Sequence, residues 1–143
     1  MKKTDVFCDS SALVPLFSGQ SGSADSRPLL NRKSVAVWWG TVVEITSGLA
    51  RLAREGTIDG PRMAKACARV RALREQWIEV QPSERVRQIA LLLLERHALT
   101  AADALQLAAA LVWANERPQS RSFVCLDARL SDAARKEGFE VAP

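Results

Sequence analysis

Four acidic residues stand at positions where their carboxylates could do chemistry together: Asp9, Glu44, Asp103 and Asp127. Asp9 and Asp127 directly follow apolar runs with strand character, whereas Glu44 and Asp103 lie in the first turns of predicted helices. In an open parallel sheet, ligands bind outside the carboxyl ends of the strands, where loops and helix N-termini converge. We therefore expect the four acids, from four separate segments, to meet at one edge of a sheet.

Few basic residues are available to neutralise these acids. Residues 5–17 and 99–114 contain no lysine or arginine. Unpaired carboxylates that lie close together repel, and one of them binds a proton unless a divalent cation sits between them. All-oxygen ligation favours Mg²⁺ or Mn²⁺ over zinc. The acids therefore predict a site for a magnesium or manganese ion.

Each acid also has a purely structural interpretation. Asp9 and Asp127 are suited to cap helices, and Glu44 and Asp103 are favoured in a first turn by the helix dipole. Thr100 is a candidate cap for the helix that contains Asp103. It is the combination of the four acids, more than any one, that points to a metal site.

The elements that must position these acids alternate between strand and helix. Short β-branched or aromatic runs predict strands, and apolar residues at helical spacing, bounded by caps, proline or glycine, predict helices. The expected strands are 6–8, 34–38, 78–80, 122–126 and 139–141, and the expected helices are 12–17, 42–55, 61–77, 84–97, 101–114 and 128–137. Thr41 is a candidate helix cap, and residues 18–23 read as a surface loop. This alternation predicts an α/β fold with a mostly parallel sheet covered by helices on both faces.

Apolar residues are more abundant on two helices than one inner face requires. Val86, Ile89, Ala90, Leu93 and Leu94 are expected to point inward, and residues 104–114 are apolar nearly all round. Together with the run 91–94, this surplus leaves two alternatives: burial in one larger core, or pairing with a second copy or a partner helix.

Composition excludes several classes of protein. A chain of 143 residues that is 48% hydrophobic can bury a core, so we expect one domain over residues 1–143 and neither a disordered nor a collagen-like chain. No apolar run approaches the ~20 residues needed to cross a membrane, and the N-terminus lacks a signal-like segment, which favours the cytoplasm. Three cysteines without a C-x-x-C pair suit buried, reduced thiols. The formal charge of +4 is compatible with a polyanionic partner and decides nothing alone.

Four short motifs, in order along nearly the whole chain, resemble the acidic motifs of PIN-domain ribonucleases, in particular compact toxins of the VapC type. They are Phe7-Cys8-Asp9-Ser10-Ser11-Ala12-Leu13, Val43-Glu44-Ile45, residues 99–108 around Asp103, and residues 123–130 around Asp127. The resemblance implies a three-layer α/β/α sandwich, endonuclease action on single-stranded or looped RNA with Mg²⁺ or Mn²⁺, and an antitoxin partner that blocks the site. A homodimer is expected from the apolar surplus.

On this interpretation Asp9 and Asp127 are the principal metal ligands, and Asp103 binds the metal directly or through water. Glu44 either binds the metal or orients a water molecule. Ser11 is a candidate for orienting a ligand or phosphate, with helix capping as the alternative. Five basic residues on the second and third predicted helices are candidates to contact the RNA backbone, with a solvated helix face as the alternative. They are Arg51, Arg54, Arg62, Lys65 and Arg69.

Three further residues have open roles. Trp38 and Trp39 are adjacent in a strand and so point to opposite faces, which leaves at most one free to stack on a base. His97 is better explained as the end of a helix than as a general base.

Two other classes of α/β protein do not fit. A haloacid-dehalogenase-type site needs a second aspartate where Ser11 stands, and a receiver domain needs an acidic pair at its first strand and a phosphoryl-accepting aspartate on a middle strand. The remaining alternative is a PIN-like module that binds RNA or protein without catalysis.

Overall fold

The structure is a computed structural model, and it describes residues 5–19 and 34–142. Its core is one five-stranded sheet with the strand order β3-β2-β1-β4-β5. All the strand pairings in this part of the chain are parallel. The strands are β1 (Val6–Cys8), β2 (Val35–Trp38), β3 (Ile78–Val80), β4 (Ser122–Val124) and β5 (Glu140–Ala142).

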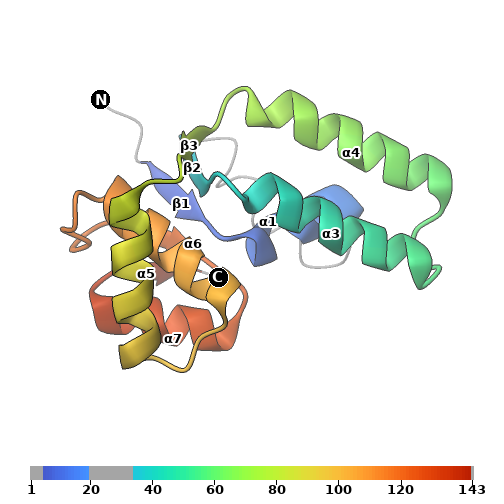
Figure 1. The fold of residues 1–143 in the computed structure, drawn as a ribbon. Helices are drawn as coiled ribbons and strands as arrows, with labels where there is room; N and C mark the ends of the chain where they lie inside the picture. The colour runs from blue at the N-terminus through green and yellow to red at the C-terminus, as the bar shows by residue number, and fades with distance from the viewer. Residues whose placement is uncertain (1–4, 20–33, 143) are drawn as a thin grey trace.

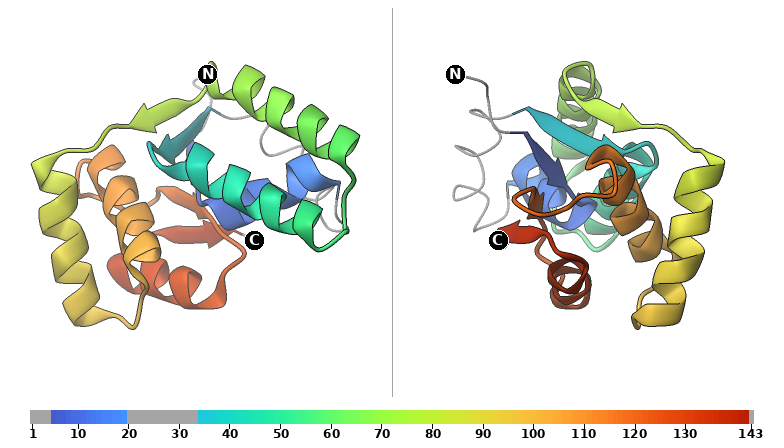
Figure 2. Two further views of the ribbon diagram at one scale, coloured as in Figure 1. Left: turned by 45° about the vertical axis from the view of Figure 1, so that its right-hand side comes forward. Right: turned by 90° about the vertical axis from the view of Figure 1, so that its left-hand side faces the viewer.

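Helices cover both faces of the sheet (Figures 1 and 2). One face carries α1 (Ser10–Ser18), α3 (Thr41–Arg54) and α4 (Gly60–Arg74). The other carries α5 (Glu84–Arg96), α6 (Ala101–Trp113) and α7 (Ala128–Glu137). The predicted three-layer α/β/α sandwich with a parallel sheet is therefore confirmed.

Local capping explains where the helices begin. The Thr100 hydroxyl accepts a hydrogen bond from the Asp103 backbone N–H at 3.2 Å, so Thr100 caps α6 as predicted. Thr41 is not a cap: Gly40 occupies that position, and Thr41 is the first residue of α3. The Thr41 side chain is instead buried, and it takes part in the site described below.

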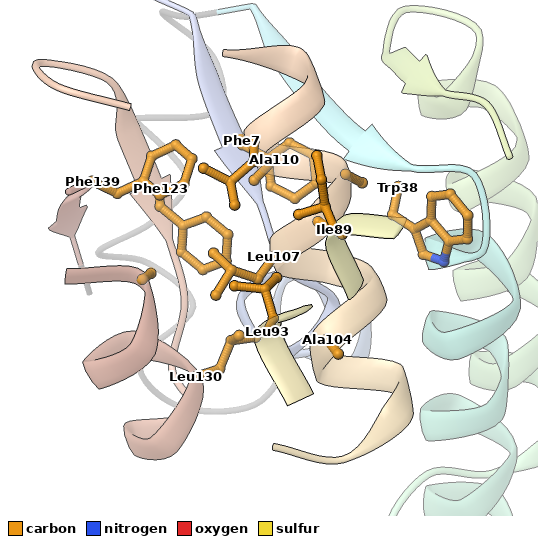
Figure 3. Close-up of a cluster of buried hydrophobic side chains, with 14 of the residues drawn as sticks. Phe7, Trp38, Ile89, Leu93, Ala104, Leu107, Ala110, Phe123, Leu130 and Phe139 are labelled. Atoms are coloured by element: carbon orange, nitrogen blue, oxygen red, sulfur yellow. The ribbon is translucent and has the colours of Figure 1, made fainter. Parts of the chain in front are cut away.

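A separate apolar core lies on each face of the sheet. On the face of α5, α6 and α7, the rings of Phe7 and Phe123 stack with centroids 5.7 Å apart, and Leu107 is fully buried against the same cluster (Figure 3). The apolar helix α6 is buried between the sheet and α5, which explains why it is apolar nearly all round. On the opposite face Ile45 and Leu49 of α3 are fully buried.

Two sequence predictions about burial are wrong. Leu94 does not point inward but is 40% exposed, because α5 packs with one face only and Leu93 occupies it. The strand predicted to run buried through Leu126 ends at Val124, and Leu126 is 52% exposed. The chain leaves the strand there because the Leu126 backbone N–H turns to the Ser11 hydroxyl, at 3.0 Å.

Other predictions have mixed outcomes. Cys8 and Cys125 are buried free thiols and Cys67 is half-buried, as expected for reduced cysteines. Most of the predicted surface loop at 18–23 lies outside the described residues. No helix in residues 5–19 or 34–142 is long and apolar enough to cross a membrane.

Candidate functional site

The strand order places a topological switch point between β1 and β4. From β1 the chain builds β2 and β3 on one side, then crosses over to build β4 and β5 on the other. At such a point the loops after the two central strands diverge and leave a crevice that binds ligands. Asp9 follows β1, and Asp127 lies three residues after β4, so both acids stand at this crevice.

Asp9 is the most deeply buried of the four acids, with 3% of its surface exposed. It caps α1, because its Oδ2 accepts the Ser11 backbone N–H at 3.1 Å. Burial is the main cause that raises the pKa of Asp9 to about 6, and the negative charges of Glu44 and Asp103 raise it further. The structural role predicted for this residue and its place among the other acids are both observed.

Glu44 projects from the first turn of α3 and is held by two donors. The Ser10 hydroxyl donates to Glu44 Oε1 at 2.7 Å, and Gln106 Nε2 donates to the same oxygen at 2.9 Å. Gln106 Nε2 also donates to the Thr41 hydroxyl at 2.9 Å. The orientation of Glu44 is therefore set by residues from α1 and α6 as well as by its own helix.

Asp103 and Asp127 complete the acidic group. Burial raises the pKa of Asp103, hydrogen bonding with Thr100 offsets part of this rise, and the charge of Asp127 raises the pKa again, against a smaller opposing effect of Arg129. Asp127 is exposed and caps α7, since its Oδ1 accepts the Leu130 backbone N–H at 2.9 Å. The four acids are thus linked in a chain of mutual repulsion, from Glu44 and Asp103 to Asp9 and from Asp127 to Asp103.

Ser11 and Cys125 tie the loops of β1 and β4 together. The Ser11 hydroxyl accepts the Leu126 N–H, and the Cys125 thiol lies 3.7 Å from Asp9 Oδ2. Burial raises the pKa of Cys125 to about 11, so the thiol remains protonated at neutral pH. Ser11 therefore fixes the relative position of the two loops at the crevice, consistent with its predicted place beside the acids.

The donor chemistry of this group fits a divalent cation. Its carboxylates offer hard oxygen ligands, and burial together with their mutual repulsion raises the pKa values of Asp9 and Asp103. The buried Oε1 of Gln106 has no hydrogen-bond partner among the described residues. In that same part of the chain, no three His, Cys, Asp or Glu side chains are close enough to hold a metal ion. The acids are therefore spaced more widely than a coordination shell, and a cation would relieve their excess negative charge.

Ser10 and Gln106 belong to the site but were not predicted as site residues. Gln106 carried a signal, because it is the only strongly polar residue between Ala104 and Ala114 and lies three positions after Asp103, on the same side of the helix. Ser10 carried none that separated it from a simple helix-start residue.

The five basic candidates lie away from the acids. Arg62, Lys65 and Arg69 line a separate cavity of about 270 Å³ against the end of α1. Arg69 lies over the Phe17 ring at 5.9 Å. Phe17 is roughly 12 Å along α1 from Asp9, from the rise of a helix. Arg51 and Arg54 lie in the last turn of α3, at the opposite end from Glu44.

The three residues with open roles are also placed. Trp38 is buried and Trp39 is 50% exposed, as expected from their opposite directions. His97 ends α5, and its Nε2 lies 2.7 Å from Glu137 Oε2. This contact links the ends of α5 and α7, so the helix-end interpretation of His97 fits the structure better than a catalytic one.

Together the fold and site define a small parallel α/β protein with a group of acidic residues at the switch point of its sheet. The family model of the PIN domain matches residues 6–136. The chain therefore belongs to the PIN domain family, and the resemblance noted in its motifs is confirmed.

Solved structures share the same fold. VapBC2 from Rickettsia felis, bound to a DNA fragment from its promoter, matches 98% of this chain and 100% of its own at 9% identity, with a TM-score of 0.67. FitAcB from Neisseria gonorrhoeae matches 96% of each chain at 17% identity and a TM-score of 0.63. A toxin–antitoxin complex from Klebsiella pneumoniae matches 87% of this chain and 88% of its own at 16% identity and 0.60. No curated protein matches the sequence.

Proposed function

We propose that this protein is a divalent-metal-dependent endoribonuclease that cuts single-stranded or looped RNA, acting as the toxin of a toxin–antitoxin pair. The observation that carries the proposal is the group of acids at the switch point, where burial and, to a lesser extent, repulsion raise the pKa of Asp9 to about 6. Membership of the PIN family supports the nuclease part. The toxin–antitoxin complexes among the fold neighbours support the antitoxin partner. We place the activity in the cytoplasm as part of the same proposal.

Each acid has a distinct role in this proposal. Asp9 and Asp127 would be the principal ligands of Mg²⁺ or Mn²⁺, and Asp103 would reach the ion through water, because the acids are spaced more widely than a coordination shell. The ion would supply Lewis-acid stabilisation of the charge that develops on the phosphate. The two donors to Glu44 Oε1 keep its carboxylate oriented toward the crevice, where it positions a water molecule for attack. Ser11 ties the loops of β1 and β4 together, so that Asp9 and Asp127 keep a fixed relative position.

The basic residues have a secondary role in binding. Phosphate contacts require only positive charge placed along the path of the strand. Arg51, Arg54, Arg62, Lys65 and Arg69 are all exposed on α3 and α4. Because they lie away from the acids, we assign them to RNA flanking the cleaved bond.

A metal-titrated cleavage assay on structured RNAs tests the function. We expect cleavage that increases with Mn²⁺ or Mg²⁺, stops with a chelator, and is absent when all four acids are replaced by their amides. Glu95→Gln, at an exposed acid of α5, serves as the matched control and should cleave normally. If the wild type and the four-amide variant bind RNA equally and neither cuts it, the result would support the non-catalytic alternative instead.

The proposed homodimer uses an exposed leucine strip on α5. Leu91, Leu92 and Leu94 are 59%, 44% and 40% exposed, an unusual apolar surface for one helix. We expect a concentration-dependent dimer in sedimentation, and a monomer after Leu91→Glu with Leu94→Glu. Ile78→Glu, which charges an exposed apolar residue on β3, should leave the dimer intact. A wild-type protein that stays monomeric at high concentration would rule the dimer out.

A further inference from the structure

A pocket of about 350 Å³ opens beside the ends of β2 and β3 and has no part in the chemistry proposed above. Its volume lies within the range of ~300–1,000 Å³ that is common for small-ligand sites. The residues that line it and matter here are Trp38, Pro82, Ser83, Val86, Arg87 and Leu105.

The indole of Trp38 forms one wall of the pocket. Trp38 is only 7% exposed, so its ring packs against neighbouring groups over most of its surface. In Figure 3 the indole extends away from the phenylalanine rings, at the edge of the apolar cluster. A flat aromatic wall of this kind favours a planar ligand that can stack on it.

The position of this indole is set by the backbone above it. A Cβ atom at Gly40 would lie 2.6 Å from Trp38 Nε1, which is closer than real side chains approach. Glycine at position 40 therefore lets the chain pass directly over the ring. The ring is held in place as a rigid wall of the pocket.

The remaining walls combine flat apolar surfaces with a polar rim. Pro82, Val86 and Leu105 supply the apolar part, and Ser83 and Arg87 lie at the opening. Arg87 is exposed and pairs with Glu84 at 3.0 Å, so the rim offers both a donor and an acceptor. Proteins that bind unpaired bases use this combination: stacking on aromatic or apolar faces and hydrogen bonds to the base edge.

The pocket adjoins the acidic crevice. Leu105 lies in its wall, and the next residue, Gln106, bonds Glu44 and Thr41 at 2.9 Å each. Trp38 ends β2, two residues before Gly40, the N-cap of the helix that carries Glu44. An RNA strand with its phosphate at the acids therefore has a neighbouring base within reach of the pocket.

We infer that this pocket receives one unpaired nucleobase of the RNA strand that is cut, and so contributes to the choice of cleavage site. The inference rests on the proposed function and extends it to sequence recognition. The base stacks against the indole wall, and the polar groups on its edge face the rim at Ser83 and Arg87.

The test measures the affinity of the Asp9→Asn variant, which should bind RNA without cutting it, for short RNA strands. In each strand one nucleotide, at a different position, is abasic. We expect one position to weaken binding roughly tenfold, the size of one lost stacking contact, while the others change it little. Adding Leu105→Trp, which fills the pocket from α6, should weaken binding of the intact strand by a similar factor and abolish the penalty at that position.

Two further variants keep the test decisive. Pro82→Trp fills the pocket from the opposite wall in case Leu105→Trp does not fold, and Ile78→Trp adds the same ring at an exposed position elsewhere and should change nothing. The inference would be overturned if every abasic position weakened binding equally, or if the loss at one position persisted in both pocket-filling variants. The pocket would then be assigned to a side chain of a protein partner. Metal-dependent cleavage of intact RNA by the wild type would show that the proposed function stands even so.

Discussion

Replacing Asp9 with asparagine is expected to reduce metal-dependent RNA cleavage by at least ~100-fold. The loss of one charged ligand removes several kcal/mol of charge stabilisation at the phosphate, and each 1.36 kcal/mol is a factor of ten in rate. Asparagine keeps the cap of α1, because it accepts the Ser11 N–H as aspartate does. The measurement is initial cleavage rate against Mn²⁺ concentration, with circular dichroism to show that the fold is retained.

The same substitution is expected to stabilise the metal-free protein at neutral pH. The folded-state pKa of Asp9 is about 6 against an ordinary 3.8, so the folded protein binds this proton more tightly than the unfolded chain. The free energy of unfolding therefore falls as pH rises from about 4 to about 6, by about 3 kcal/mol. Asp9→Asn removes that fall, and its stability at pH 7 should exceed that of the wild type.

Urea denaturation at several pH values measures this difference, since the two curves should coincide below pH 4 and separate above it. Mn²⁺ should raise the melting temperature of the wild type, because a ligand that binds only the folded state stabilises it, and should do so much less for the variant. Parallel pH curves for the two proteins would contradict the role assigned to burial of Asp9. Unchanged cleavage would contradict its role as a ligand.

Replacing Gln106 with leucine is expected to reduce cleavage by ~10–100-fold while the fold remains. Partners that orient metal-ligating carboxylates typically contribute this much to metal affinity or activity. Leucine has a similar volume and removes the buried Oε1 that lacks a partner, which offsets the loss of the two hydrogen bonds to Thr41 and Glu44. Cleavage rate and the Mn²⁺ concentration for half-maximal rate are the measurements.

Ser10→Ala is the companion variant to Gln106→Leu, because it removes the other donor to Glu44 Oε1 without changing the core. We expect a smaller loss from Ser10→Ala alone, and a loss in the double variant that is not the product of the two single losses, since both residues act on one oxygen. Wild-type cleavage by Gln106→Leu would show that Glu44 needs no such support.

Much of the fold followed from local patterns. The helix ending at Gly138 and the strand at residues 78–80 were predicted within a residue of their observed limits, because caps, glycines and apolar spacing are local signals. Leu94 and Leu126 were misplaced for the same reason. Their apolar character says that burial is favourable, but only the packing of neighbouring elements decides whether a surface is there to cover them.

The candidate site divides in the same way. Asp9 was predicted at the crevice because a residue that directly follows a strand must lie at its carboxyl end. The hydrogen bonds from Ser10 and Gln106 to Glu44 join residues 34 and 62 positions apart. Such contacts depend on how α1, α3 and α6 meet, which no local pattern encodes.

The amino-acid sequence by itself determined the alternation of strands and helices, the acids at the strand ends and the excess of negative charge there, because each depends on neighbours along the chain. Only the tertiary structure decided which polar side chains support Glu44, how far Arg62, Lys65 and Arg69 of α4 lie from the acids, and that a pocket opens beside Trp38. Those features arise from the packing of segments distant in sequence, where the shape of one element sets the surroundings of another.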